Sequence, residues 1–182
     1  SGYKKKKKIA KYTLFRCLIS RAHVVSARAI RVWKLDFDII METLNVTTFS
    51  NVKTGDAVNV ERSMKLGDEI GGHLLSGHVS TTATIFTLET PENNHIVTFS
   101  TDLETIKYIF TKGYIALNGV SLTVGEVDKS NQTFNVYLIP ETLRLTNLGE
   151  KVVGDKINLE IETQTRNMVD TISEMNKESI HG

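Results

Sequence analysis

Cysteine, proline and long apolar runs are all scarce in this chain of 182 residues. Its single cysteine, Cys17, excludes an internal disulfide framework and a cysteine-rich zinc site. Only two prolines occur, which argues against proline-rich linkers. No apolar run approaches about 18 residues, so the sequence predicts no membrane-spanning helix and no membrane partner. With 40% hydrophobic and 24% charged residues, the composition is typical of a globular protein, for which we expect a cytoplasmic location.

The net charge of +1 conceals an uneven distribution. Residues 1–35 hold eleven of the 22 Lys and Arg and none of the 21 Asp and Glu, so residues 36–182 carry eleven basic against 21 acidic side chains, a net charge of −10. The basic part opens with five lysines at 4–8 and continues with apolar residues three and four positions apart, as in an amphipathic helix. We interpret residues 1–36 as a solvated segment. An organellar transit peptide, a basic arm for nucleic acid or membrane, and an out-of-frame stretch are the alternatives.

The rest of the chain has the pattern of a small β-protein. Short apolar runs, separated by Gly or Asn/Asp, predict strands at 37–41, 57–60, 83–88, 95–99, 114–117, 120–124, 134–139 and 157–161. A capping box at 101–104, with Gly113 as the stop, predicts one helix. A second helix is predicted over 165–177, where Met168, Ile172 and Met175 share one face. The fold class is therefore mostly β with two helices.

Two segments of the chain repeat one another. Residues 42–61 read ETLNVTTFSNVKTGDAVNVE and residues 141–160 read ETLRLTNLGEKVVGDKINLE, in register and without a gap. An aromatic-led strand is predicted before each segment. The chain therefore holds two copies of one β unit, or parts of them.

Four segments closely resemble riboflavin synthase of the α-chain type: DEIGGHLLSGHV (68–79), KGYIALNGVSLTVGEV (112–127), LIPETL (138–143) and VGDKINLE (153–160). The resemblance implies tandem six-stranded Greek-key lumazine-binding barrels followed by a helix that holds a homotrimer together. It implies dismutation of two molecules of 6,7-dimethyl-8-ribityllumazine to riboflavin and 5-amino-6-ribitylamino-uracil, with no metal or organic cofactor. The active site would form between barrels of neighbouring subunits.

On this resemblance, four parts of the chain are expected. They are a basic N-terminal segment (1–36), a remnant of the first barrel (37–67), the second barrel (68–162), and an oligomerisation helix with a tail (163–182). No second copy of the Asn118–Thr123 segment precedes residue 37, and the family's opening sequence is missing. We therefore expect an incomplete first barrel, and a chain that binds lumazine better than it dismutates it.

The candidate site residues belong to the second barrel. Ser121 and Thr123 alternate in a predicted strand, which places both hydroxyls on one face. Glycines beside His73 and His78 let a ligand approach closely. By resemblance, His78, Ser121 and Thr123 are catalytic. The substrate-binding set implied is His73, His78, Lys112, Ser121, Thr123, Ile139, Thr142 and Glu162.

Each of these residues also has a purely structural interpretation. The Ser121–Thr123 pair would suit a solvated strand face, His73 and His78 could be structural, and Lys112 would suit the last turn of the helix before Gly113. A non-catalytic lumazine or flavin carrier is the alternative function, although the intact 73–78 and 121–123 patterns favour the enzyme. A nucleic-acid partner is not expected, because residues 36–182 are acidic overall.

Overall fold

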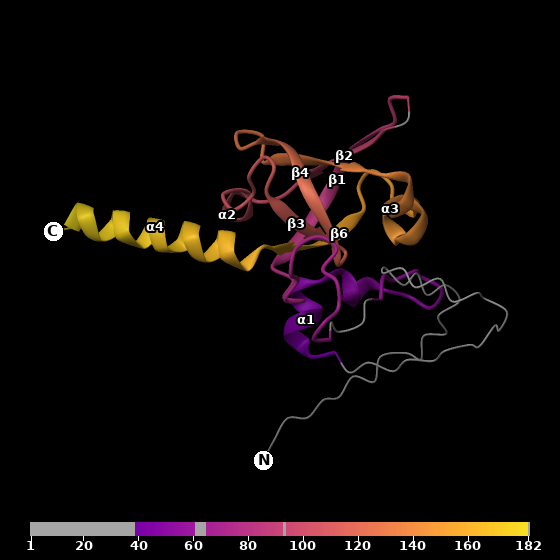
Figure 1. Cartoon of the computed structure of the whole chain (residues 1–182), viewed down its shortest axis with the longest axis horizontal. Coiled ribbons are helices and arrows are strands. Elements are labelled where there is room, and N and C mark those ends of the chain that lie inside the picture. Colours follow the sequence, from indigo (N-terminus) through magenta and orange to yellow (C-terminus); the bar gives the residue numbers. More distant parts are fainter. Residues whose placement is uncertain (1–38, 61–64, 93, 182) are drawn as a thin grey trace, which may run out of the picture.

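Six antiparallel strands form one closed barrel (Figure 1). The computed structural model describes residues 39–60, 65–92 and 94–181 of the chain. The strands are β1 (Thr81–Glu89), β2 (His95–Ser100), β3 (Tyr114–Leu117), β4 (Val120–Asp128), β5 (Thr133–Leu138) and β6 (Lys156–Ile161). The helices are α1 (Met41–Val46), α2 (Leu103–Ile106), α3 (Pro140–Leu145) and α4 (Thr163–His181), with 3₁₀ turns η1 (Thr48–Asn51) and η2 (Asn147–Glu150). None of the described helices is long and apolar enough to cross a membrane.

The strand order around the barrel is β1-β2-β5-β4-β3-β6, and β6 closes the ring against β1. Strands β3, β4 and β5 are consecutive hairpin neighbours, whereas β2 lies beside β5 and β6 lies beside β3. This arrangement is a Greek key. The mostly β prediction, with a six-stranded barrel and a C-terminal helix, is therefore confirmed for the described part of the chain.

The barrel is filled by every second residue of its strands. In β1 and β2 the buried positions are Ala83, Ile85, Val97 and Phe99, while their neighbours face outward. The rings of Phe99 and Phe134 stack in the core with their centroids 5.4 Å apart. Burial of each large apolar side chain stabilises the fold by roughly 1.5–3 kcal/mol. This packing gives the outer face of the barrel a rigid backbone on which polar side chains can be placed.

Two of the predicted strands are wrong. Residues 39–40 have no regular structure and Met41 begins α1, so the strand predicted at 37–41 does not form in its described part; residues 37 and 38 lie outside the described residues. The strand predicted at 57–60 is reduced to a single β-bridge at Val60. Helices α1 and α3 were not predicted, because each is a short helix of six residues whose apolar positions do not differ clearly from those of a strand.

The two segments that match in sequence have the same local structure, 99 positions apart. Helix α1 and η1 in the first segment correspond to α3 and η2 in the second. Thr47 and Thr146 are the N-caps of η1 and η2, and each accepts a hydrogen bond from the backbone N–H two residues later. The hydroxyl of Thr47 donates to the Thr43 carbonyl at 2.6 Å, as that of Thr146 does to Thr142 at 2.7 Å. About twenty residues of sequence therefore determine this motif locally.

The two copies dock against each other through asparagines. The backbone N–H of Thr48 donates to Asn158 Oδ1 at 2.7 Å, and the backbone N–H of Asn147 donates to Asn59 Oδ1 at 2.8 Å. Since Thr48 corresponds to Asn147 and Asn59 to Asn158, the exchange is reciprocal. Asn118 joins it, because its carbonyl accepts from Asn59 Nδ2 and its Oδ1 accepts from the Asn158 N–H. The exchange holds α1 and η1 beside the end of the barrel near β3 and β6 (Figure 1).

Helix α2 is much shorter than predicted. Asp102, rather than Thr101, is its N-cap, with the carboxylate accepting from the Thr105 N–H at 2.7 Å. The helix ends at Ile106, whose carbonyl accepts from the Ile109 N–H in the turn that follows, and the Lys129 ammonium donates to the carbonyls of Ile106 and Ile109. An ammonium can satisfy carbonyls that would otherwise bond to further helical N–H groups. The predicted continuation to Gly113 is therefore wrong.

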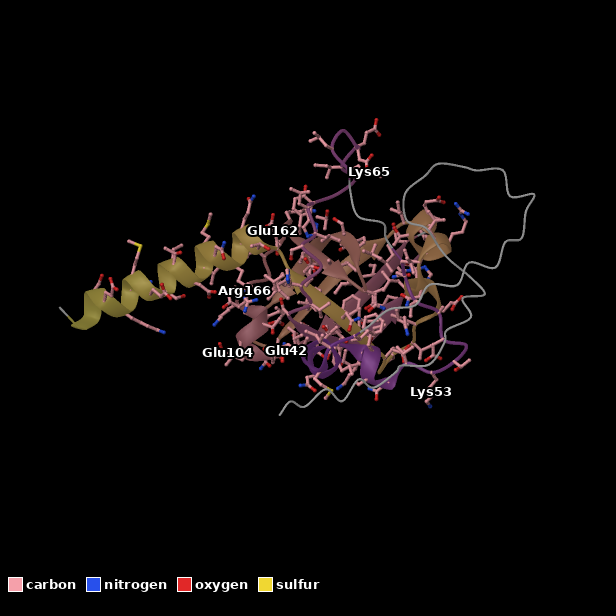
Figure 2. All side chains as sticks on the ribbon, turned by 90° about the horizontal axis from the view of Figure 1, so that it is seen from below. Glu42, Lys53, Lys65, Glu104, Glu162 and Arg166 are labelled. Atoms are coloured by element: carbon pink, nitrogen blue, oxygen red, sulfur yellow. The ribbon has the colours of Figure 1, made fainter. Side chains whose placement is uncertain are left out.

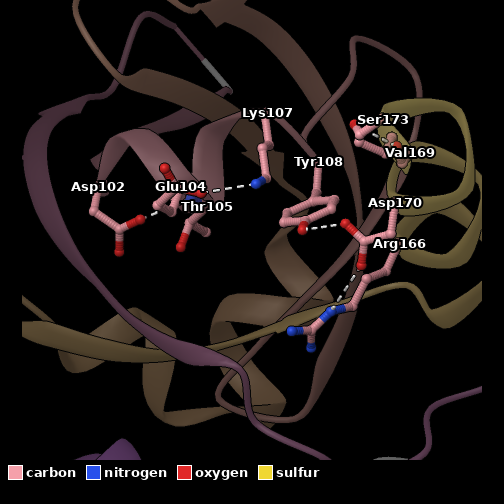
Figure 3. A network of polar contacts seen from close by, with 9 residues as sticks. All are labelled: Asp102, Glu104, Thr105, Lys107, Tyr108, Arg166, Val169, Asp170 and Ser173. Atoms are coloured by element: carbon pink, nitrogen blue, oxygen red, sulfur yellow. Dashed lines mark hydrogen bonds and ion pairs between the residues drawn. The ribbon is translucent and has the colours of Figure 1, made fainter. Parts of the chain in front are cut away.

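Helix α4 extends away from the barrel (Figure 1) and is longer than predicted. Its first turns are fixed to the α2 region, where the Tyr108 hydroxyl donates to the Asp170 carboxylate at 2.5 Å (Figure 3). Arg166 lies over the Tyr108 ring, 5.8 Å from its centroid, and pairs with Asp170 at 3.9 Å. Met168, Ile172 and Met175 are more than half exposed, so the apolar face of α4 is uncovered in the single chain.

Candidate functional site

A cavity of about 330 Å³ lies on the outer surface of the barrel, where β4, β5 and α3 meet. Strand β4 contributes most of its wall. The lining residues are Lys112, Ser121, Leu122, Thr123, Val124, Gly125, Tyr137, Ile139 and Thr142. Five of the eight predicted site residues are among them: Lys112, Ser121, Thr123, Ile139 and Thr142. Residues far apart in the sequence are thus brought together where the sequence predicted a ligand site.

Ser121 and Thr123 share the outward face of β4, as predicted. Val124, the next residue, is buried in the core, which directs the side chain of Thr123 outward. Across the hairpin, Thr123 pairs with Tyr114 and Ser121 pairs with Ala116. The two hydroxyls therefore stand on a strand whose position is set by the packed interior of the barrel.

Tyr137 on β5 and Gly125 on β4 also line the cavity, and the tyrosine ring lies close to the backbone of the glycine. A bulge interrupts the β4–β5 pairing between Val124 and Val127. A Cβ at Gly125 would collide with Asn135 Oδ1 and lie 2.6 Å from Tyr137 Cε2, so any larger residue would have to displace these two side chains. Sequence reasoning missed four lining residues: Leu122, Val124, Gly125 and Tyr137. The last of these could have been found, because Tyr137 and Ile139 are two residues apart in the strand predicted at 134–139 and would face the same side of it.

Lys112 lies at the exposed rim of the cavity. Its backbone is left-handed, with φ of 66°, and its N–H donates to the Val124 carbonyl at 2.9 Å. The residue therefore extends the β3–β4 hairpin. The alternative interpretation, a basic residue in the last helical turn, is wrong because α2 ends at Ile106. Lys112 brings a positive charge to a site that otherwise offers hydroxyls.

His73 contacts the site through Ser121 and does not line the cavity. Its Nδ1 lies 2.7 Å from Ser121 Oγ, and its backbone N–H donates to the same oxygen at 3.1 Å. Burial lowers the pKa of His73, and the negative charges of Glu162 and Glu160 oppose this only in part. Glu162 lies where α4 leaves the barrel (Figure 2) and accepts a hydrogen bond from the Thr165 hydroxyl. Burial therefore favours the neutral form of the imidazole.

His78 is exposed, and it does not line the cavity. Its loop is anchored by the buried carboxylate of Glu160, which accepts from Ser76 N, Ser76 Oγ and Gly77 N at 2.8, 2.9 and 3.1 Å. The His78 N–H in turn donates to Ser76 Oγ. The structure thus places His78 on a fixed loop outside the cavity, with its ring available to solvent. Among the described residues, no three His, Cys, Asp or Glu side chains are grouped to hold a metal ion.

Residues 76–162 match the family model described as lumazine binding domain. The riboflavin synthase of Escherichia coli (strain K12) is 50% identical over 139 residues, which cover 76% of this chain and 64% of that protein. The riboflavin synthase of Buchnera aphidicola subsp. Schizaphis graminum is 42% identical over 145 residues, covering 79% of this chain and 69% of that protein. The chain therefore spans about two thirds of the length of these relatives.

Solved structures show the same barrel. The complex of LumP with riboflavin superposes with a TM-score of 0.59 at 28% identity, covering 67% of this chain and 65% of that one. The complex of LumP with 6,7-dimethyl-8-(1'-D-ribityl) lumazine gives a TM-score of 0.58 at 26% identity, covering 66% and 64%. The cavity at Ser121 and Thr123 falls inside the matched segment. On the sequence identity and this coverage, the chain belongs to the riboflavin synthase family.

Proposed function

We propose that this chain is a riboflavin synthase that dismutates two molecules of 6,7-dimethyl-8-ribityllumazine to riboflavin and 5-amino-6-ribitylamino-uracil. The observation that carries the proposal is the cavity on β4, where five predicted site residues meet inside the lumazine-binding segment. Relatives that are 40–50% identical and named riboflavin synthase support it. The two LumP complexes support lumazine and riboflavin as ligands of this barrel.

The cavity suits one lumazine in size and chemistry. Its volume lies at the lower end of the range for small-molecule sites, about 300–1,000 Å³. Tyr137 and Ile139 offer apolar surface to a flat bicyclic ring, while Ser121, Thr123 and Thr142 offer hydroxyls to its polar edge and ribityl chain. The neutral ligand needs hydrogen bonds more than strong charge, and Lys112 at the rim supplies the one cation of the lining. We assign Ser121 and Thr123 to binding and orienting the ring on which the reaction takes place.

Dismutation requires a second lumazine stacked on the first. The advantage of such a site comes mainly from holding two rings in the reactive geometry. The cavity is open to the outside of the barrel, so a second ligand can approach from another barrel. We assign His78, which is exposed on its anchored loop, as the acid or base that acts on that second ring.

We propose the domain organisation expected from the sequence, with the second barrel at 68–162 and an oligomerisation helix at 163–182. The uncovered stripe Met168, Ile172 and Met175 on α4 supports a homotrimer in which these helices pack together. The matching local structure of 41–51 and 140–150 supports a common origin of the two units. Deletion of residues 163–182 is expected to give a monomer in sedimentation; an unchanged assembly would contradict the role of α4.

Turnover tests the proposed reaction. The purified chain, mixed with 6,7-dimethyl-8-ribityllumazine, is expected to develop the absorbance and fluorescence of riboflavin. The double variant Ser121→Ala/Thr123→Ala should lose this activity. A matched control is Thr82→Ala/Thr84→Ala, because Thr82 and Thr84 have the same spacing on β1 but do not line the cavity. A loss in both double variants would show that the hydroxyls of β4 have no special role.

A non-catalytic lumazine or flavin carrier is the second candidate, because the LumP complexes hold these ligands in a barrel of the same fold. A carrier would bind lumazine and keep its spectrum unchanged over time. The same mixture therefore distinguishes the two functions: growth of riboflavin identifies the enzyme, and a persistent bound-lumazine spectrum identifies the carrier.

A further inference from the structure

The side chain of Ser121 is contacted by residues 72 and 73, in the segment that precedes β1. Its Oγ receives the His73 backbone N–H at 3.1 Å and lies 2.7 Å from His73 Nδ1. Gly72 makes this approach possible, because a Cβ there would collide with Ser121 Oγ and lie 2.7 Å from Ser121 Cβ. The backbone of Gly72 is also left-handed, with φ of 104°, which favours glycine. Residues 72 and 73 are therefore fitted closely to one hydroxyl group.

The imidazole of His73 is itself fixed in place. It stacks on the Tyr114 ring, with centroids 5.2 Å apart and an angle of 18° between the planes. Tyr114 is the cross-strand neighbour of Thr123 in the β3–β4 hairpin, so the ring that stacks on His73 belongs to the same hairpin as both candidate hydroxyls. His73 Nε2 is buried and has no hydrogen-bond partner among the described residues. The ring thus has one polar contact in the described structure, and that contact is Ser121.

The choice of tautomer follows from counting donors and acceptors. If the proton were on Nε2, a buried N–H would be left without an acceptor, which is rare and costly. If the proton is on Nδ1, it has Ser121 Oγ as its acceptor, and only a lone pair remains unpaired at Nε2. The serine oxygen then accepts two hydrogen bonds, from the backbone N–H and from Nδ1–H. Its own hydrogen has no role in these contacts and is free to point into the cavity.

We propose that His73 is a positioning residue that donates twice to Ser121 Oγ, through its backbone N–H and its ring Nδ1–H, and so makes Ser121 a hydrogen-bond donor to the ligand. The inference rests on the proposed function and assigns a polarity to that site. Ser121 then selects a ligand with an acceptor at this position, such as a carbonyl oxygen or an unprotonated ring nitrogen. A serine with both acceptor positions filled does not take a proton from the ligand. Burial of the imidazole, which lowers its pKa, supports the neutral form in this role.

The tautomer is measurable without any ligand. In the full chain labelled with ¹⁵N-histidine, the ring nitrogens of His73 are assigned by the disappearance of their signals in the variant His73→Asn. At neutral pH we expect Nδ1 to be the protonated nitrogen and Nε2 to be the unprotonated one. A neutral ring with its proton on Nε2 would overturn the proposal.

A double-mutant cycle tests whether His73 acts through Ser121. The amide nitrogen of asparagine occupies nearly the same position as Nδ1, whereas that of glutamine reaches the position of Nε2. For riboflavin bound to the full chain, we expect His73→Gln to raise Kd roughly five- to tenfold and His73→Asn to raise it less than about threefold, as for loss and retention of one hydrogen bond. In the Ser121→Ala background, His73→Gln should change Kd less than about twofold.

The outcomes separate this inference from the proposed function. If His73→Gln weakens binding equally with and without the Ser121 hydroxyl, His73 acts on the ligand or on the fold directly, and the positioning role is wrong. If His73→Asn binds riboflavin as weakly as His73→Gln does, a donor at the position of Nδ1 does not support binding, and this result also overturns the proposal. If the unaltered chain binds neither riboflavin nor lumazine, the proposed function fails, while the ¹⁵N spectrum still decides the contact between His73 and Ser121.

Discussion

The two copies of the repeated segment differ in their surroundings far more than in their local structure. Both have a six-residue helix, a threonine cap, a 3₁₀ turn and a Gly-Asp turn, in which an aspartate accepts from the backbone N–H three residues earlier. Past this turn they diverge. Residues 157–160 form part of β6 and are buried between β1 and β3, whereas residues 57–60 are half-buried and make one bridge. Short-range hydrogen bonds therefore specify the motif, and only long-range pairing makes it part of a barrel.

The same difference explains why the second copy contributes a residue, Thr142, to the cavity on β4. Thr142 lines it because β4 and β5 stand beside α3 and bring Ser121, Thr123 and Tyr137 to the same place. Its counterpart Thr43 has the same cap contact with Thr47 that Thr142 has with Thr146. Local structure alone does not make a ligand site; the neighbouring strands supply most of it.

The largest difference between the two copies is expected for substitutions of their apolar residues. Ile157 is fully buried and its counterpart Val58 is half-buried. We expect Ile157→Ala to lower the free energy of unfolding by about 2–5 kcal/mol, and Val58→Ala to lower it by about 1 kcal/mol or less, because a cavity forms only at the packed position. Urea unfolding measures both. Equal losses would mean that residues 57–60 are packed as tightly as β6.

The reciprocal asparagines predict the next largest effect. Asn59→Ala leaves the N–H of the buried Asn147 without its acceptor, which we expect to cost about 1–3 kcal/mol. The docked first copy should then be cleaved faster by trypsin after Lys53. Asn51→Ala is the matched control, because Asn51 is an exposed residue of the same copy. Unchanged cleavage in Asn59→Ala would show that other contacts hold the two copies together.

A smaller and equal effect is expected at the two caps. Thr47 and Thr146 are both buried, at 6% and 4% exposure, and each makes the same two hydrogen bonds. Replacing either with alanine should destabilise its own copy by about 1 kcal/mol. Hydrogen exchange at the amides of Phe49 and Leu148 reports this separately for each copy. A large effect in one copy and none in the other would break the local equivalence.

The smallest predicted effect lies outside both copies and serves as a reference. Hydrogen bonds from the Ser130 hydroxyl, and from the backbone and side chain of Asn131, lower the pKa of Asp128 to about 2 from 3.8. Because the folded pKa is the lower one, this contribution to stability is present above pH 4 and is lost as the pH falls from about 4 to about 2. In the Asp128→Asn variant, Tm should therefore fall less steeply between about pH 4 and about pH 2 than in the unaltered chain. If both proteins lose Tm equally steeply there, the turn at Asp128 does not contribute.

Much of the second barrel was predictable from the sequence, because alternation marks strands that are buried on one face. The strands at 83–88, 95–99, 114–117, 120–124, 134–139 and 157–161 all correspond to observed strands. The short α1 and α3 were missed because six residues do not show a helical period. The end of α2 was missed because no local pattern shows that Lys129, more than twenty residues later in the chain, donates to the carbonyls of Ile106 and Ile109.

The site could be predicted only in part. Ser121 and Thr123 follow from strand alternation, and Lys112, Ile139 and Thr142 from the family resemblance. The contact of His73 with Ser121 is accompanied by the stacking of His73 on Tyr114, and no local sequence pattern reveals either contact. Gly125 and Tyr137 depend on a bulge that pairs two strands irregularly. Contacts of this kind arise from the closed barrel as a whole.

The most direct test of the account is a fluorescence titration of the full chain with 6,7-dimethyl-8-ribityllumazine. We predict saturable binding that Ser121→Ala/Thr123→Ala weakens by roughly tenfold or more, as expected for two lost hydrogen bonds. Thr82→Ala/Thr84→Ala should leave the binding unchanged. Absence of saturable binding, or equal affinity in all three proteins, would contradict the assignment of the cavity on β4 as the lumazine site.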